Sequence, residues 1–128
     1  MKTKILIIDD DELTLFLHKT LIQNSEYSLG AKYYLSAESA LKYITKNISL
    51  NTAFLLLLDI NMKNMDGWQL LDELKTIANE HNIYVVLVTS STDEADKKRA
   101  SSYKQVHGFL SKPLKLTDFK MLKRIKKL

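Results

Sequence analysis

The chain has 128 residues, of which 45% are hydrophobic, so it is long enough for one compact domain with a core and too short for two. It contains no cysteine, which excludes disulfides and thiolate metal sites and fits a reducing compartment. The apolar run near the start, Ile5 to Ile8, is too short for an export signal and ends in three aspartates. No other stretch approaches membrane-spanning length, so we expect a cytoplasmic protein without a membrane span.

The net charge of +4 is distributed unevenly along the chain. Residues 1–96 carry 8 basic and 14 acidic side chains, whereas residues 97–128 carry 11 and 1. Such a basic block is compatible with affinity for nucleic acid. A solvated helical face or a docking surface for an acidic partner is the more common cause, and we expect no direct nucleic-acid binding.

Five short apolar runs predict strands, and they occur in this order: Lys4 to Ile8, Ala31 to Leu35, Ala53 to Leu58, Ile83 to Val88, and Gly108 to Leu110. The third and fourth runs are apolar without alternation, which is typical of strands that are buried on both faces.

Amphipathic segments with helical spacing lie between these runs and after the last one. Their apolar positions are Leu13, Phe16, Leu17 and Leu21; Ala37, Leu41 and Ile44; Leu70, Leu71, Leu74 and Ile77; and Leu116, Phe119, Leu122 and Ile125. A less apolar helix fits between Thr92 and Tyr103.

Residues that favour helix starts agree with these segments. Ser36 is expected to cap the second helix and Asp66 the third, where Gly67 eases the loop into the helix. Ser91 and Glu94 have the spacing of a capping box for the fourth helix.

Five repeats of strand then helix predict an α/β protein with a parallel sheet that helices cover on both sides. We expect a doubly wound (βα)5 flavodoxin-like sandwich whose five-stranded sheet has the order 2-1-3-4-5.

Polar residues follow four of the five predicted strands at their carboxyl ends, where sheets of this class carry their working groups. They are Asp9 and Asp10, Asp59, Thr89 and Ser90, and the run Ser111, Lys112 and Pro113. If the first and third strands are neighbours, the three aspartates converge, and their mutual repulsion favours binding of a hard cation. Oxygen-only ligands suit Mg²⁺.

Lys112 could pair with Asp59 or with a phosphoryl oxygen, and Thr89 adds a hydroxyl donor. Together with a metal, these groups are suited to phosphoryl transfer to a carboxylate. Taken singly, each feature has an ordinary explanation: the acidic pair could cap a helix, Asp59 could lie in a turn, and Lys112 could be a surface lysine. Their placement on four strand ends argues against coincidence.

Five segments resemble the signature of the receiver domain of two-component response regulators: residues 7–11, 57–62, 65–67, 88–90 and 111–113. The resemblance covers essentially the whole chain, so residues 1–128 are expected to form one receiver domain. It implies that Asp59 is the phosphoacceptor and that Mg²⁺ is held by Asp10 directly, by Asp9 mainly through water, by Asp59 and by the backbone carbonyl of Asn61.

The same resemblance makes Thr89 the switch hydroxyl, Lys112 the phosphoryl contact and Phe109 the aromatic switch residue, with Ser90 and Pro113 in supporting positions. The family has a cis bond before this proline. Phosphorylation would change the surface formed by the fourth helix, the fifth strand and the last helix.

Two positions bear on how the site would behave. Lys63 occupies a position where the family commonly has proline, so the loop after Asp59 loses a rigid element. Neither Asn61 nor Ser91 is suited to orient an attacking water, so self-dephosphorylation is expected to be slow.

The resemblance implies a signalling domain that catalyses only its own phosphorylation and slow dephosphorylation, with a sensor histidine kinase or a histidine phosphotransfer protein as its partner. No output domain is visible in these residues, so we expect a stand-alone receiver that acts on an unknown target by protein contacts; the receiver part of a longer regulator is the alternative. Our candidate docking or homodimer surface is a basic face that carries Lys97, Lys98, Arg99, Lys120, Lys123 and Arg124.

Three other functions compete with this interpretation. Aspartyl-phosphate hydrolases resemble Asp-x-Asp followed by Gly-Thr, and here Asn61 stands at the third position. A flavin carrier needs a phosphate-binding loop after the first strand, and Asp9, Asp10 and Asp11 at that position would repel the phosphate of the cofactor. A phosphate-independent receiver-like interaction module is the remaining alternative.

Overall fold

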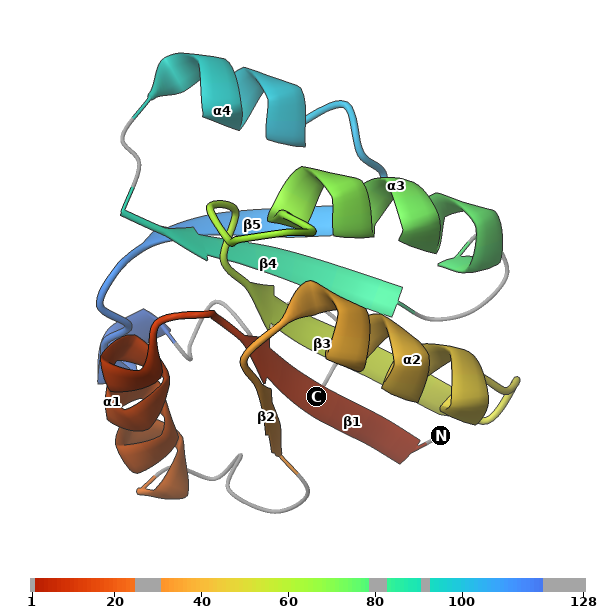
Figure 1. Cartoon of the computed structure of the whole chain (residues 1–128), viewed down its shortest axis with the longest axis horizontal. Helices are drawn as coiled ribbons and strands as arrows, with labels where there is room; N and C mark the ends of the chain where they lie inside the picture. Colours follow the sequence, from red (N-terminus) through yellow and green to blue (C-terminus); the bar gives the residue numbers. More distant parts are fainter. Residues whose placement is uncertain (1, 25–30, 79–82, 91–92, 119–128) are drawn as a thin grey trace.

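The computed structural model describes residues 2–24, 31–78, 83–90 and 93–118. These residues form five strands, β1 (Lys2–Ile8), β2 (Lys32–Tyr34), β3 (Thr52–Leu58), β4 (Ile83–Thr89) and β5 (Val106–Ser111). They also form four α-helices, α1 (Glu12–Gln23), α2 (Ala37–Asn47), α3 (Gly67–Ala78) and α4 (Glu94–Ala100), and a 3-10 turn at Leu116–Asp118. The strands are parallel and lie in the order β2-β1-β3-β4-β5, which confirms the predicted topology (Figure 1).

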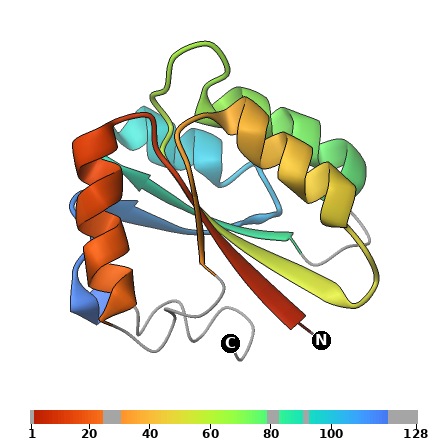
Figure 2. The same cartoon turned by 60° about the horizontal axis from the view of Figure 1, so that its bottom comes forward.

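The sheet is covered on both faces (Figure 2). Helices α2, α3 and α4 pack on one face, around a cluster that includes Leu56, Leu70 and Leu74. Helix α1 packs on the other face, around a cluster that includes Leu57 and Ile22. The predicted last helix lies outside the described residues beyond its start at Leu116. Within the part of the chain that the structure describes, no helix is long and apolar enough to span a membrane.

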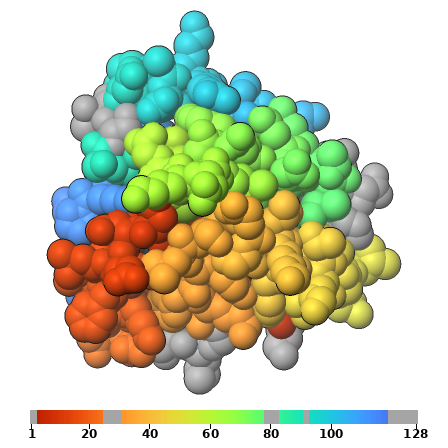
Figure 3. All heavy atoms as spheres, in the orientation of Figure 1, coloured from red at the N-terminus to blue at the C-terminus, as the bar shows by residue number. Residues whose placement is uncertain are grey.

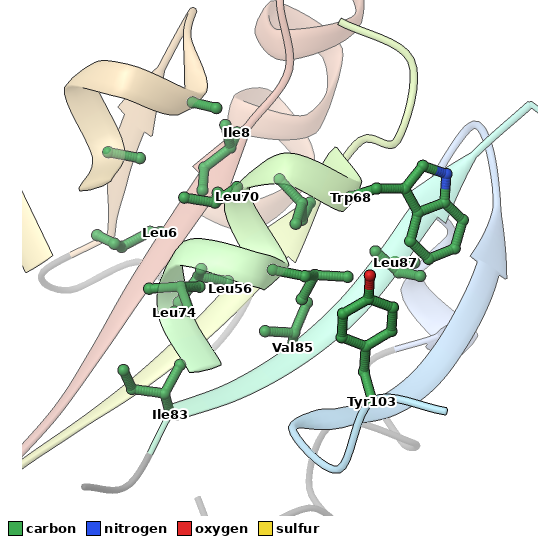
Figure 4. Packing of buried hydrophobic residues seen from close by; sticks show 14 of the residues in the cluster. Leu6, Ile8, Leu56, Trp68, Leu70, Leu74, Ile83, Val85, Leu87 and Tyr103 are labelled. Atoms are coloured by element: carbon green, nitrogen blue, oxygen red, sulfur yellow. The ribbon is translucent and has the colours of Figure 1, made fainter. Parts of the chain in front are cut away.

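Strand β3 is buried along its whole length, as its unbroken apolar sequence predicts. Because successive side chains point to opposite faces, Leu56 joins the α3 side and Leu57 the α1 side. Figure 4 shows Leu70 and Leu74 of α3 turned toward the strand residues, including Leu56. The central strand therefore fixes both halves of the core.

The register of the sheet brings the strand ends level with one another. Ile8 of β1 pairs with Leu58 of β3, and Leu58 pairs with Leu87 of β4. The N–H of Asp59 donates to the carbonyl of Ile8 over 3.0 Å, so the ladder continues one step past the strand. As a result, the polar residues that follow β1 and β3 lie side by side.

The apolar stripe predicted for α1 is wrong. Leu13 and Phe16 are 65% and 63% exposed, and Leu17 is also exposed, whereas α1 buries Leu15, His18 and Ile22. Apolar residues occur all around this helix, so two faces satisfy the helical spacing. The true inner face includes a histidine, which the hydrophobic pattern could not assign to the core.

Two of the three predicted helix caps are confirmed. Ser36 caps α2, and Asp66 forms a reciprocal pair with Gln69 in which each backbone N–H donates to the other side chain over 2.9 Å. The predicted capping box of α4 is wrong, because α4 begins at Glu94 with Asp93 as its cap; Ser91 itself lies outside the described residues. An aspartate directly before the helix replaces the serine two residues earlier.

An aromatic stack joins α4 to α3. The Arg99 guanidinium lies 4.4 Å from the Trp68 ring, and Trp68 stacks on Tyr103 with 5.8 Å between centroids. The Tyr103 hydroxyl donates to Asp72 over 2.9 Å. Figure 4 shows Trp68 and Tyr103 at the edge of the core, so this contact ties the short α4 helix to the start of α3.

We predict that Leu74→Ala lowers the free energy of unfolding by about 2 to 5 kcal/mol, because Leu74 is fully buried between α3 and the sheet. Urea unfolding followed by circular dichroism measures this change. Leu50→Ala is the matched control, since Leu50 is 74% exposed and its truncation should cost less than about 0.5 kcal/mol. Equal losses for the two variants would contradict the described packing.

Candidate functional site

A cleft of about 500 Å³ opens at the carboxyl ends of β1 and β3. Its lining contains seven of the nine residues that the sequence singled out, and Ser90 and Pro113 are among them. The full set is Asp9, Asp10, Asp11, Thr14, Leu17, Asp59, Asn61, Ser90, Lys112 and Pro113. The strand ends thus gather most of the predicted site into one hollow.

Three carboxylates form the centre of this cleft. Asp9, Asp10 and Asp59 each offer a carboxylate oxygen, and these oxygens lie within 4.8 Å of one another. Asp9 and Asp59 are only 2% and 4% exposed, while Asp10 is half-buried. The arrangement is a cluster of acidic oxygen ligands that could bind a metal ion.

Lys112 enters the cluster from the segment after β5. Its ammonium lies 2.6 Å from a carboxylate oxygen of Asp9 and 3.2 Å from one of Asp59. The sequence suggested Asp59 as its partner, and the structure adds Asp9 at the shorter distance. The backbone N–H of Lys112 donates to the carbonyl of Thr89, and the bond between Lys112 and Pro113 is cis, as predicted.

The charges of the cluster are out of balance. When all three acids are ionised, they exceed the Lys112 ammonium by two negative charges. Burial and the neighbouring Asp9 charge raise the pKa of Asp59 to about 6, against the opposing effects of Lys112 and the Asn61 amide. Burial alone would lower the pKa of Lys112, but its bond with Asp9 and the charges of both acids raise it. The site therefore favours additional positive charge.

The loop after β3 is held against the β1–α1 turn. The backbone N–H of Lys63 donates to Asp10 over 2.9 Å, and the N–H of Asn61 donates more weakly to Asp59 over 3.4 Å. In Figure 3 the yellow-green atoms of this loop lie against red atoms of the first segment. Proline at position 63 would have no N–H to donate. Compared with proline, Lys63 thus lacks a rigid ring but donates a hydrogen bond to a member of the acidic cluster.

Gly67 sits where α3 approaches the end of β3 most closely. A Cβ atom at this position would lie 2.7 Å from the carbonyl oxygen of Asp59 and 2.8 Å from the Cα of Ile60. The N–H of Gly67 also donates to the Ile60 carbonyl over 2.8 Å. Glycine is therefore required by the close approach of backbone to backbone beside Asp59.

Two predicted switch residues lie apart from the cleft lining. Thr89 is fully buried at the end of β4. Phe109 is half-buried against the α3 and α4 side of the core, with the Lys97 ammonium 6.0 Å from its ring. Both are thus on the strands that connect the cleft with α4.

Three cleft residues were missed by the sequence analysis: Asp11, Thr14 and Leu17. Asp11 caps α1 by accepting from the N–H of Thr14 over 3.0 Å, a spacing that could have been read from the sequence. It was missed because Asp9 and Asp10 were considered as the cap. Leu17 gave no signal, since its spacing suggested a buried position.

Comparisons with known proteins are consistent with this site geometry. The family model described as the response regulator receiver domain matches residues 5–125. The chain is 26% identical over 118 residues to the probable methanogenesis regulatory protein FilR2 of Methanothrix harundinacea. This match covers 91% of this chain and 76% of FilR2. It is 30% identical over 97 residues to the regulatory protein VanRc of Enterococcus gallinarum, covering 76% of this chain but only 38% of VanRc.

The fold is also shared with solved structures. A response regulator receiver protein from Dyadobacter fermentans has a TM-score of 0.82 at 21% identity, over 95% of this chain and 96% of that one. At this identity the likeness concerns the fold alone.

We predict that Asp59→Asn stabilises the protein at about pH 7.5, by about 1 to 3 kcal/mol. The folded pKa of Asp59, about 6, lies above the ordinary value of 3.8, so protonation of Asp59 favours the folded state. That contribution is complete below about pH 4 and is lost as the pH rises through about 6.

Urea unfolding in the presence of a chelator measures this difference, and repeating it at about pH 4 provides the control, since wild type and variant should then be equally stable. A variant that is less stable than wild type at about pH 7.5 would contradict the charge imbalance.

Proposed function

The chain belongs to the response regulator receiver domain family, and on this premise we propose that it is a phosphoacceptor domain of a two-component system, with Asp59 as the acceptor. The observation that carries the proposal is that Asp59, Asp9 and Lys112 meet at the carboxyl ends of the strands. We also propose that residues 1–128 form one receiver domain, which the family match over residues 5–125 supports.

In the proposed reaction, a carboxylate oxygen of Asp59 attacks the phosphorus of a phosphohistidine on the donor protein. The new bond joins this oxygen to phosphorus, and the bond between phosphorus and the imidazole nitrogen breaks, so the imidazole leaves with the electron pair. The Lys112 ammonium lies 3.2 Å from Asp59 and, in this proposal, would donate to a phosphoryl oxygen. The raised pKa of Asp59 means that ionisation of the nucleophile is favoured above about pH 6.

We propose Mg²⁺ as the cofactor, held by Asp9, Asp10 and Asp59 and by the backbone carbonyl of Asn61. The fit rests on an oxygen-only ligand set with two negative charges in excess. When bound, Mg²⁺ would neutralise the charge that develops on the transferring phosphoryl group.

The switch is proposed to run from the cleft to α4 through β4 and β5. Thr89, at the end of β4, would move its hydroxyl toward the phosphoryl group, and Phe109 would repack against the α4 side of the core. Ser90 and Pro113 would support the site from the cleft lining. The surface that changes would include α4, β5 and the last helix, which lies outside the described residues beyond residue 118.

A receiver domain implies phosphorelay partners such as kinases. We propose a sensor histidine kinase or a histidine phosphotransfer protein as the donor, and an unidentified protein as the target. The α4 part of the basic face, with exposed Lys97, Lys98 and Arg99, supports docking or homodimerisation there. Its other basic residues, Lys120, Lys123 and Arg124, lie outside the described residues. The cytoplasmic location and the absence of direct nucleic-acid binding stay predictions.

The alternative is a receiver-like interaction module that never accepts phosphate. It would keep the fold, the acidic cluster and the α4 surface, so it differs from the main proposal only in the chemistry of Asp59. A direct test of phosphoryl acceptance therefore separates the two.

We predict that incubation with acetyl phosphate and Mg²⁺ adds one phosphoryl group to the protein, as measured by intact mass. The adduct should be absent without Mg²⁺ and in Asp59→Asn, which lacks the nucleophile. Asp66→Asn is the matched control, because it removes a half-buried carboxylate yet keeps a side chain that caps α3, and it should be phosphorylated like wild type. A folded wild type without an adduct would favour the interaction module.

A further inference from the structure

His18 is a buried polar residue on α1 that neither the sequence signature nor the proposed reaction uses. It is 2% exposed and lies on the helix face that packs against the sheet. Its Nε2 atom accepts a hydrogen bond from the backbone N–H of Leu114 over 3.2 Å. The contact joins residues that are 96 positions apart in the sequence.

Leu114 belongs to the segment that carries Lys112 into the cleft. The N–H of Lys112 donates to the carbonyl of Thr89 on β4 over 2.9 Å. Pro113 has no N–H, and the next donor, that of Leu114, is used by His18. The segment is thus fastened to β4 before the proline and to α1 after it. Figure 2 shows the blue segment after β5 lying beside α1.

Solvent is not a ready substitute for His18 at this point. Leu114 is 6% exposed and its side chain belongs to the core cluster on the α1 face. A buried backbone N–H without an acceptor is costly, so removal of the imidazole should shift the segment toward another acceptor or toward water. Because Lys112 is only two residues away, such a shift would move its ammonium relative to Asp9 and Asp59.

The protonation state of His18 agrees with this contact. An accepting Nε2 must be free of a proton, so the imidazole has to be neutral. Burial lowers the pKa of His18, the Asp9 charge opposes this effect, and the Lys112 charge adds to it. The neutral form that the hydrogen bond requires is therefore also the form that the surroundings favour near neutral pH.

We propose that His18 is a positioning residue for phosphoryl transfer, which holds Lys112 over Asp59 by accepting the hydrogen bond of the Leu114 N–H. The inference rests on the proposed function, since it assigns His18 a role in the reaction at Asp59. It also connects the two edges of the cleft, because α1 follows directly from the acidic residues and the bond runs from this helix to the lysine segment.

The test compares His18→Leu with His18→Gln in the full chain. Leucine fills a similar volume but has no acceptor, whereas the glutamine Oε1 can take the place of Nε2. Leu15→Ala is the matched control, since it removes a buried contact of the same helix and leaves the hydrogen bond in place. Three quantities are measured for each variant: the rate constant of phosphorylation by acetyl phosphate at saturating Mg²⁺, the exchange rate of the Leu114 amide hydrogen, and the chemical shift of the Lys112 side-chain methylene at fixed pH.

We expect His18→Leu to lower the rate constant about tenfold, to speed exchange of the Leu114 amide and to shift the Lys112 resonance. His18→Gln should restore both rates to within about twofold of wild type and return the Lys112 resonance to its wild-type position. Leu15→Ala should leave the rate constant within about twofold despite a lower melting temperature. A folded His18→Leu variant with the wild-type rate constant, or a glutamine variant as slow as the leucine variant, would overturn the proposal.

Failure of the proposed function gives a different result. If wild type itself takes no phosphoryl group, the reaction at Asp59 is wrong and His18 has no role in it. The Leu114 and Lys112 signals still test the positioning contact in that case, because neither depends on phosphorylation. Unchanged signals in His18→Leu would then overturn the contact as well.

Discussion

Two buried carboxylates, those of Asp9 and Asp59, share the single ammonium of Lys112, and the surrounding structure serves to hold this arrangement. Isolated ionised carboxylates are strongly disfavoured in a protein interior, and here a raised pKa of Asp59 is the consequence. The parallel register of β1 and β3 brings the two acids together, because the ladder continues to the N–H of Asp59. Their repulsion gives the site its affinity for positive charge and, in our proposal, its chemistry.

The loops around the acids are held in place by contacts with several different elements. The β3–α3 loop is fixed by the bond from the Lys63 N–H to Asp10 and by the close backbone approach at Gly67. The lysine segment is fixed to β4 through Lys112 and to α1 through His18. In our proposal, a change in charge at Asp59 is transmitted through β4 and β5 to α4, because these hydrogen bonds join the loops of the site to the sheet and its helices.

Most of the fold and the centre of the site could be predicted from the sequence, because they depend on local pattern. Unbroken apolar runs marked the buried strands, strand ends placed Asp59 beside Asp9, and the resemblance to receiver domains is confirmed by the family match. The caps at Asp11 and Asp93 are local features that the sequence analysis misassigned. The other errors depend on contacts between distant residues. The inner face of α1 includes His18, whose hydrogen-bond partner is Leu114, and no spacing rule could reveal that pair. The bond from the Lys63 N–H was hidden for the same reason, as backbone donors leave no trace in a sequence.

The acidic cluster is short of positive charge, and the pKa of Asp59 is raised as a result. Isothermal titration of Mg²⁺ in buffers of different ionisation enthalpy tests it directly, because it counts the protons released on binding. With the pKa of Asp59 at about 6, binding at about pH 6 should release about half a proton, and the release should vanish at about pH 8. The release should also vanish in Asp59→Asn. Absence of Mg²⁺ binding, or binding at about pH 6 without proton release, would show that the cluster does not have this charge imbalance.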